Sequence, residues 1–314
     1  MIGGRGADFG MQAVMSRSWR RWLGSRRAMN SAGRIRHPLA YIEDPVTLNH
    51  DYLYDNSSSV AADRLRGLEA VEDSSTIELL NRLNVAPGWH CLEIGAGAGS
   101  IARWLAERVG PQGRIVATDI DTRLLDPTLY EVWQHDLVQD ALPSSAFDLV
   151  HLRHVLIHVS RAKHETILRT VRETLKPTGS LLIEESDLQS WHPSEGTPQP
   201  VRRRFSDGIA TTMMIYRSRA MNPSVGAELE QLVTNAGMTI IDRTRRTRRV
   251  KGRSPEAAFH QRSARQLADS IRSSNPTDAV LLDDFAACFD VEELDYETRA
   301  TVSVSATNSR TPSA

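Results

Sequence analysis

The sequence predicts an α/β fold with a doubly wound, mostly parallel sheet, and three observations support this prediction. Short apolar runs alternate with helical segments between residues 88 and 186, at the spacing of βαβ units. A glycine-rich joint from Gly95 to Gly99 connects the first apolar run to the helix behind it. An acidic residue then stands at the end of each of the next two runs. The 314 residues are enough for one large domain with additions.

Each element has its own signal. Apolar residues recur at helical spacing from Ser59 to Val85, where Ser75 and Glu78 form a capping box. Behind Pro87 the pattern changes to short apolar runs separated by helical segments. The predicted strands are "WHCLEIG", "GRIVATDI", "YEVWQHDL", "AFDLVHLRHV" and "SLLIEES", and the predicted helices among them are "SIARWLAERVG" and Arg161–Leu175.

The alternation breaks after residue 186 at a proline-rich loop, "SWHPSEGTPQP". Behind it, Phe205, Ile209, Met213 and Tyr216 are spaced for one face of a helix. Met and aromatic residues at this spacing are more often core than pocket. Because they fall in an insertion, we interpret the segment as a helical lid.

The C-terminal part returns to mixed elements. A helix is expected between a cap at Asn222 and Gly237, followed by the strand "MTIIDRTRRTRRV". Ser254 and Pro255 open another helix, and "RATVSVSAT" is the last strand because apolar and hydroxyl residues alternate in it. Four parts result: a helical, partly disordered extension over 1–50, a core over 51–186, the lid over 187–222, and a continuation of the core sheet with added helices over 223–314.

Composition narrows the function classes. The formal net charge is −1, so the molecule as a whole is no polyanion binder, and no apolar run is long enough to cross a membrane. Cys91 and Cys288 make no disulfide framework and fit a reducing, cytoplasmic location. Residues 1–36 carry eight arginines and one acid, Asp8, as a transit peptide does, but a disordered or misassigned start is the interpretation we favour.

The glycine-rich joint departs from a nicotinamide-binding fingerprint, because Ser100 stands where the third glycine belongs. Its register places Glu93 at the end of the first strand, where a carboxylate suits an ammonium group. Asp119 ends the second strand, a position that faces a ribose in doubly wound sheets. Asp136, with the Leu137 backbone beside it, ends the third strand and suits an adenine amine. Together these residues describe a nucleoside that carries an amino-acid tail.

This set of motifs, "CLEIGAGAG", "TDID", "HDL", "FDLVHLRHVLIH" and "LKPTGSLLIEE", resembles the class I S-adenosylmethionine-dependent methyltransferases. The resemblance implies a Rossmann-like seven-stranded sheet whose last strand runs antiparallel to the others. It also implies S-adenosyl-L-methionine as the cofactor. The expected cofactor-binding residues are Glu93, Gly95, Ala96, Gly97, Asp119, Ile120, Asp136, Leu137 and Arg153. The alternative is an ordinary strand–helix joint with surface acids.

The segment behind the fourth strand should lie nearest the transferred methyl group. It carries His151, Arg153, His154 and His158, and the three histidines would share one face if it were helical. No carboxylate or cysteine accompanies them, so we expect no metal site. His151 is the candidate general base, or else a residue that shapes the pocket. Arg153 is expected to orient the cofactor or the loop.

The substrate class is inferred largely by elimination. The fourth strand does not end in the Asn/Asp-Pro-Pro-aromatic signature of amino-group methylases, and no loop cysteine is present for attack on cytosine. The basic run Arg243–Arg253 has no interleaved aromatics, which favours a charged sheet edge or an oligomer contact over nucleic acid. A small apolar or aromatic methyl acceptor under the lid remains, against Trp191, Phe205, Met213 and Tyr216. The alternative function is a cofactor-binding regulatory or interaction module without catalysis, and a homo-oligomer stays open.

Overall fold

The computed structural model describes residues 53–54 and 59–308, all within a compact unit that spans Thr47–Ala314. The predicted extension over residues 1–50, with its arginine-rich start, lies outside the described residues. So does most of the segment that joins it to the core.

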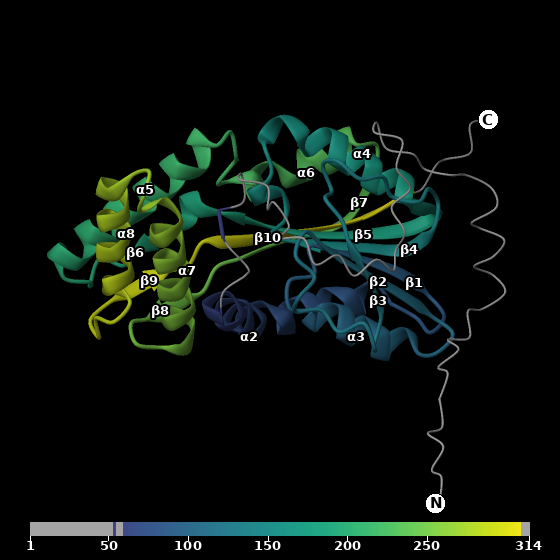
Figure 1. Cartoon of the computed structure of the whole chain (residues 1–314), viewed down its shortest axis with the longest axis horizontal. Helices are drawn as coiled ribbons and strands as arrows, with labels where there is room; N and C mark the ends of the chain where they lie inside the picture. The colour runs from purple at the N-terminus through teal and green to yellow at the C-terminus, as the bar shows by residue number, and fades with distance from the viewer. Residues whose placement is uncertain (1–52, 55–58, 309–314) are drawn as a thin grey trace, which may run out of the picture. The chain divides into compact units, whose positions relative to one another are not determined.

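Seven strands of the described chain form one sheet in the order β3-β2-β1-β4-β5-β10-β7 (Figure 1). Strands β1 to β5 run parallel, whereas β10 lies antiparallel between β5 and β7. This confirms the predicted doubly wound, mostly parallel sheet and its reversed last strand. The strand bounds are β1 His90–Ile94, β2 Arg114–Asp119, β3 Glu131–Gln134, β4 Phe147–Arg153, β5 Leu175–Asp187, β7 Thr239–Arg246 and β10 Ala300–Thr307.

Helices cover both faces of this sheet (Figure 1). Neighbouring residues of a strand point to opposite faces, so each face has its own apolar core. Leu149 and Leu182 belong to the core under α3 (Ser100–Val109), together with residues of α2 (Ser59–Arg82). Val150 and Ile183 belong to the larger core under α4 (His164–Thr174) and α6 (Val225–Asn235). The central strands are apolar on both sides for this reason.

A second group of elements, three helices and a small sheet, packs together apart from the seven-stranded sheet. Helices α5 (Gln199–Ser218), α7 (Pro255–Ile271) and α8 (Pro276–Cys288) pack with a small sheet of order β6-β9-β8. Its strands are β6 His192–Pro193, β9 Asp295–Glu297 and β8 Arg249–Lys251. An aromatic cluster fills the space between the helices, and four of its members are at most 1% exposed: Phe205, Phe285, Phe289 and Tyr296. The predicted lid is therefore one side of a packed helical layer.

Several local predictions were wrong. Ser75 and Glu78 lie inside the continuous helix α2 and do not start a new one. The fourth strand ends at Arg153, and two short 3₁₀ turns follow it: η1 (Leu156–His158) and η2 (Arg161–Lys163). A third, η3 (Leu188–Ser190), follows β5. The three histidines thus share no helical face. Asn222 turns the chain before α6, where its side-chain oxygen accepts from the Ser224 backbone N–H at 3.0 Å.

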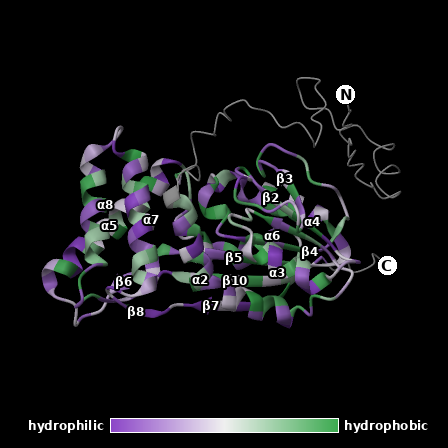
Figure 2. Cartoon of the chain, turned by 60° about the horizontal axis from the view of Figure 1, so that its bottom comes forward, coloured by the Kyte–Doolittle hydropathy of each residue, from purple (hydrophilic) through white to green (hydrophobic). Residues whose placement is uncertain are grey.

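The basic run lies where a charged sheet edge was predicted. β7 is the last strand of the seven-stranded order, and the chain from Asp242 in β7 to Arg249 in β8 is hydrophilic (Figure 2). Charged side chains on an edge strand discourage pairing with another sheet. Among the residues that the structure describes, no helix combines the length and apolar character needed to cross a bilayer.

Candidate functional site

A cavity of about 600 Å³ opens beyond the carboxyl ends of the parallel strands, and we call it the strand-end cavity. Doubly wound sheets bind their ligands at this edge. All residues that the sequence predicted for the cofactor line it: Glu93, Gly95, Ala96, Gly97, Asp119, Ile120, Asp136, Leu137 and Arg153. Residues from four separate strand ends therefore meet in one space.

Two physical reasons require glycine in the loop after β1: positive φ angles and a close approach of Val155. Gly95 and Gly97 have φ angles of 68° and 59°, in the left-handed region that other residues avoid. A Cβ on Gly95 would also stand 2.5 Å from a methyl carbon of Val155. The loop is therefore fixed in a shape that only a bare backbone allows, and its residues form part of the cavity wall.

Asp119 is held at the cavity by the loop itself. One carboxylate oxygen accepts the Gly97 N–H at 2.9 Å, and the other accepts the Asp121 N–H at 3.0 Å. Burial raises the pKa of the Asp119 carboxyl to about 6, although these backbone donors oppose the shift. A carboxylate has about four acceptor positions, so these backbone donors leave capacity for a hydroxyl group of a ligand.

Asp136 stands in the loop after β3, and its carboxylate stabilises that loop. It accepts from the Val138 backbone N–H at 2.8 Å and from the Gln139 side-chain amide at 2.6 Å. Leu137, between Asp136 and Val138 in the sequence, packs against the larger apolar core. Acids at three strand ends and an apolar floor fit S-adenosyl-L-methionine, which carries an ammonium group, a ribose and an adenine.

Glu93 heads a buried polar chain that crosses the sheet. Its carboxylate accepts from His151 Nδ1 at 2.7 Å, and His151 Nε2 lies 3.4 Å from Glu184. Glu184 in turn accepts from Ser303 at 2.8 Å and from Arg246 at 3.1 Å. These residues come from five neighbouring strands and lie on the same face. We call this set the buried polar chain.

The buried polar chain corrects the position expected for His151. The residue lies inside β4 instead of the loop behind it, is 0% exposed, and is not among the residues that line the strand-end cavity. Burial lowers the pKa of an imidazole, but the carboxylates of Glu93 and Glu184 outweigh burial and raise the His151 pKa to about 9. An imidazolium with both nitrogens engaged cannot take a proton from a ligand. His151 instead holds Glu93 in place from behind.

Arg153 turns away from the loop it was expected to order. Its guanidinium donates to the Thr76 hydroxyl at 2.9 Å and to Asp73 at 2.8 Å, both on α2. Thr76 donates onward to Glu184 at 2.6 Å. Arg153 lines the strand-end cavity and also joins α2 to the buried polar chain.

The residues predicted for the substrate divide into two groups. Tyr216 lines the strand-end cavity, and its hydroxyl lies 3.4 Å from that of Tyr54, which lines it too. Phe205 is 0% exposed within the aromatic cluster, and neither Phe205 nor Met213 lines the cavity. The prediction was wrong for these two because helical spacing identifies a face but not what packs against it. Trp191 lines the cavity as expected.

A polar group that no sequence motif indicated also lines this cavity. Arg299 donates through Nε to the Ser186 hydroxyl at 2.9 Å, and Ser186 pairs with His154 Nδ1 at 3.2 Å. The Ser186 hydroxyl thus joins the Arg299 guanidinium to His154 Nδ1. Burial lowers the pKa of His154 to about 3, so the ring is neutral. Arg299 and His154 are 145 positions apart, which no local pattern reveals.

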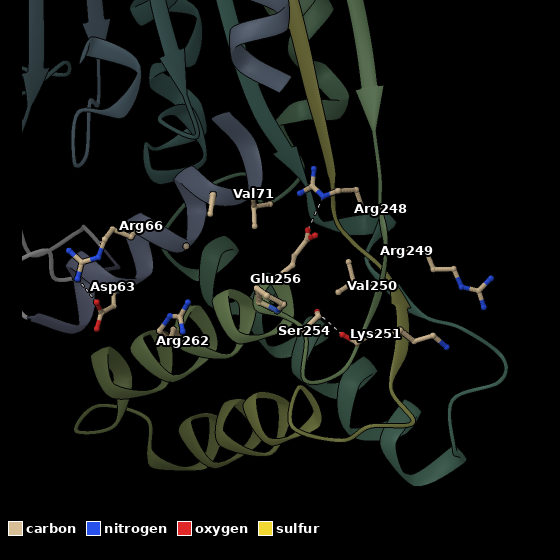
Figure 3. A pocket seen from close by; sticks show the side chains of 13 residues that line it. Asp63, Arg66, Val71, Arg248, Arg249, Val250, Lys251, Ser254, Glu256 and Arg262 are labelled. Atoms are coloured by element: carbon tan, nitrogen blue, oxygen red, sulfur yellow. Dashed lines mark hydrogen bonds and ion pairs between the residues drawn. The ribbon is translucent and has the colours of Figure 1, made fainter. Parts of the chain in front are cut away.

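A second hollow, of about 820 Å³, lies between α2, β8 and the start of α7 (Figure 3). Its basic side chains are largely paired with the protein's own acids. Arg248 binds Glu256 at 2.9 Å, and Arg249 and Lys251 bind Asp295 at 2.7 and 2.9 Å. The strand-end cavity is the stronger candidate for a functional site because its polar groups converge on open space.

Metal chemistry finds no support in the part of the chain that the structure describes, where no cluster of three or more His, Cys, Asp and Glu could hold an ion. The two cysteines, Cys91 and Cys288, are both buried free thiols.

Comparisons with known proteins point to methyltransferases. A family model described as a methyltransferase domain matches residues 64–243. The chain is 34% identical over 130 residues to a ubiquinone/menaquinone biosynthesis C-methyltransferase from Ectopseudomonas mendocina (strain ymp), covering 38% of this chain and 49% of that protein. It is 22% identical over 230 residues to an O-methyltransferase from Pyrenophora dematioidea, covering 65% and 80% of the two chains.

One solved structure among the matches is an S-adenosylmethionine-dependent methyltransferase from Mesorhizobium loti. It shares 17% identity with this chain at a TM-score of 0.41, covering 71% of this chain and 92% of that one. The chain spans about half the length of several curated relatives that it matches.

Proposed function

The chain belongs to the class I S-adenosylmethionine-dependent methyltransferases, and from this premise we propose that it methylates a small, apolar or aromatic metabolite by in-line displacement. The observation that carries the proposal is the strand-end cavity. Residues for an ammonium, a ribose and an adenine share it with an aromatic wall formed by Tyr54, Trp191 and Tyr216. One cavity can thus hold a cofactor and an apolar acceptor side by side.

The geometry of the strand-end cavity supports a role for each of the proposed cofactor-binding residues. Glu93 offers the ammonium group the carboxylate oxygen that His151 does not occupy. Gly95 to Gly97 give the amino-acid tail a backbone surface, and Asp119 accepts from the ribose hydroxyls beside Ile120. Asp136 and Leu137 form the adenine end. Arg153, at the end of β4, supports this wall through its hydrogen bonds to Thr76 and Asp73 on α2.

When bound, S-adenosyl-L-methionine supplies an activated methyl group: the acceptor's electron pair forms the new bond to carbon while the carbon–sulfur bond breaks and its pair stays on sulfur. The protein's share is alignment. Holding two reacting groups in near-attack geometry lowers a barrier by about 7–11 kcal/mol. His151 contributes by positioning Glu93, and the aromatic wall contributes by excluding water from the reacting atoms.

Ligand binding provides the first test. S-adenosylhomocysteine should raise the thermal midpoint of the purified protein, and NAD or NADP at equal concentration should not, because only a ligand of the folded state stabilises it. A preference for the dinucleotides would contradict the proposed site.

Transfer provides the second test. The protein should move a labelled methyl group from S-adenosyl-L-methionine to a component of a small-molecule extract, and mass spectrometry should find a product heavier by one methyl group. Cofactor binding without transfer to any acceptor would instead favour the regulatory module.

A further inference from the structure

The charges that line the strand-end cavity are unevenly distributed. Its four acids belong to the cofactor side: Glu93 and Asp119 at strand ends, Asp136 after β3, and Glu69, which bonds Ser100 at the start of α3. Its cations are Arg64 on α2, Arg153 at the end of β4, and three residues from later segments: Lys163, Arg219 and Arg299. The lining residues of the described chain from position 153 onward include no acid.

Arg299 differs from Arg153 in the kind of partner it has, because its hydrogen bonds go to neutral side chains. Besides the Ser186 hydroxyl, its guanidinium donates to His260 Nε2 at 3.1 Å. His260 is neutral, because burial and the nearby arginine charges lower its pKa well below the usual value. Its other nitrogen, Nδ1, lies 2.8 Å from the Tyr296 hydroxyl. Arg299 is therefore hydrogen-bonded to neutral groups.

Within the described residues, no carboxylate forms an ion pair with Arg299. Glu72 is near enough for their charges to interact, and its Oε1 binds Arg248 at 3.1 Å and accepts from Thr301 at 3.2 Å, but neither of its oxygens forms a hydrogen bond or ion pair with Arg299. A guanidinium has five N–H donors, and two of those of Arg299 are used. A partly buried charge of this kind is costly unless an anion meets it.

Aromatic rings flank the same guanidinium. Its central carbon lies 5.9 Å from the ring centre of Trp191 and 5.7 Å from that of Phe259, and all three residues line the cavity. The indole nitrogen of Trp191 is buried and has no hydrogen-bond partner among the residues described. Indole N–H is a donor only, so it calls for an acceptor oxygen. A cation, a spare donor and flat apolar surfaces thus adjoin one another.

We propose that Arg299 and the Trp191 indole N–H bind the anionic group of the methyl acceptor, and that the acceptor is a carboxylate with an aromatic or similarly flat apolar body. This inference rests on the proposed function and deepens it. The guanidinium donates charge-assisted hydrogen bonds to the carboxylate of the acceptor. Phe259 and the Trp191 ring contact the acceptor's flat apolar body. The two halves of the cavity then match their ligands in charge: acids meet the cationic cofactor, and cations meet the anionic acceptor.

The test uses the full chain saturated with S-adenosylhomocysteine, so that cofactor binding is measured first and separately. Benzoate and 2-naphthoate are then titrated by calorimetry against their neutral isosteres, benzamide and 2-naphthamide. We expect the carboxylates to bind about 10- to 100-fold more tightly than the amides, as for loss of hydrogen bonds to a charged group. Equal binding of the two series, or no binding of either carboxylate, would overturn the inference.

Variants locate the effect. Arg299→Met should abolish the preference for the carboxylates and leave S-adenosylhomocysteine affinity unchanged, whereas Arg203→Met, at a side chain 85% exposed on α5, should change neither. Trp191→Phe replaces the indole by a smaller aromatic ring without the N–H, so it tests the same site if Arg299→Met fails to fold. A carboxylate preference that survives both substitutions would place the anion elsewhere. Failure of S-adenosylhomocysteine to bind the unmodified chain would refute the proposed function instead.

Discussion

Replacing His151 by glutamine would remove the positive charge that lies between two buried carboxylates. In the native protein the pKa of His151 is raised from its ordinary value of 6.5 to about 9 by Glu93 and Glu184, against the effect of burial. Because the folded-state pKa is the higher one, the protonated imidazole stabilises the fold. This stabilisation is complete below about pH 6.5 and is lost as the pH rises through about 9.

The magnitude follows from the shift. Each pKa unit corresponds to about 1.4 kcal/mol, so this group adds about 3 kcal/mol to the free energy of unfolding. Urea unfolding of the native protein between about pH 7 and pH 9.5 should lose about 2–3 kcal/mol from this source. His151→Gln should be less stable at pH 7 and should lack this part of the pH dependence.

The comparison isolates His151 from other groups. Burial also raises the pKa of Asp119 to about 6 and that of Glu185 to about 8. Ionisation of either carboxyl therefore also lowers the protein's free energy of unfolding as the pH rises. Both are present in the two proteins, so their effects cancel in the difference. His192→Gln, at a side chain 60% exposed, is the matched control. Parallel stability curves for the native protein and His151→Gln would refute the charged buried polar chain.

Four further substitutions test the remaining assignments. Asp119→Ala should weaken S-adenosylhomocysteine binding by about 1–3 kcal/mol in calorimetry, and unchanged affinity in a folded variant would remove Asp119 from the site. Gly99→Ala should cost about 1–3 kcal/mol of stability in urea unfolding, because φ is 83° and a Cβ would overlap the Tyr130 hydroxyl; a neutral result would mean that the loop shifts freely. Phe205→Ala should cost about 3–5 kcal/mol of stability with the acceptor's Michaelis constant unchanged. Tyr216→Ala should raise that Michaelis constant with little loss of stability. If instead Phe205→Ala raised the Michaelis constant and left stability unchanged, Phe205 would be a substrate-contacting residue of the lid.

Sequence reasoning worked where a function depends on the end of a strand. Glu93 and Asp119 could be placed because parallel strands bring their carboxyl ends to one edge, whatever the loops do. The spacing of the glycines behind Glu93 then favoured a ligand with an ammonium group over one with a pyrophosphate. Both inferences need only the order of short elements, which the sequence states directly.

It failed where the answer depends on what packs against an element. His151 and His154 are three residues apart, yet β4 extends just far enough to bury the first behind the sheet and leave the second at the cavity. Phe205 and Tyr216 belong to one helix, yet α8 covers only the first of them. Arg299 comes from the far end of the chain and carries no local signal at all. Tertiary contacts decide these cases.

The position of β10 has a consequence for the order of folding. This strand fills the gap between β5 and β7, so the sheet on that side stays incomplete until residues 300–307 have been synthesised. Ser303 meets Glu184 across 119 positions of sequence. Until then, Glu184 lacks one of its donors, and β5 presents an unpaired edge to other chains. During synthesis from the N-terminus, the polypeptide therefore passes through a state in which the cofactor residues are already made but their sheet is still open on one side.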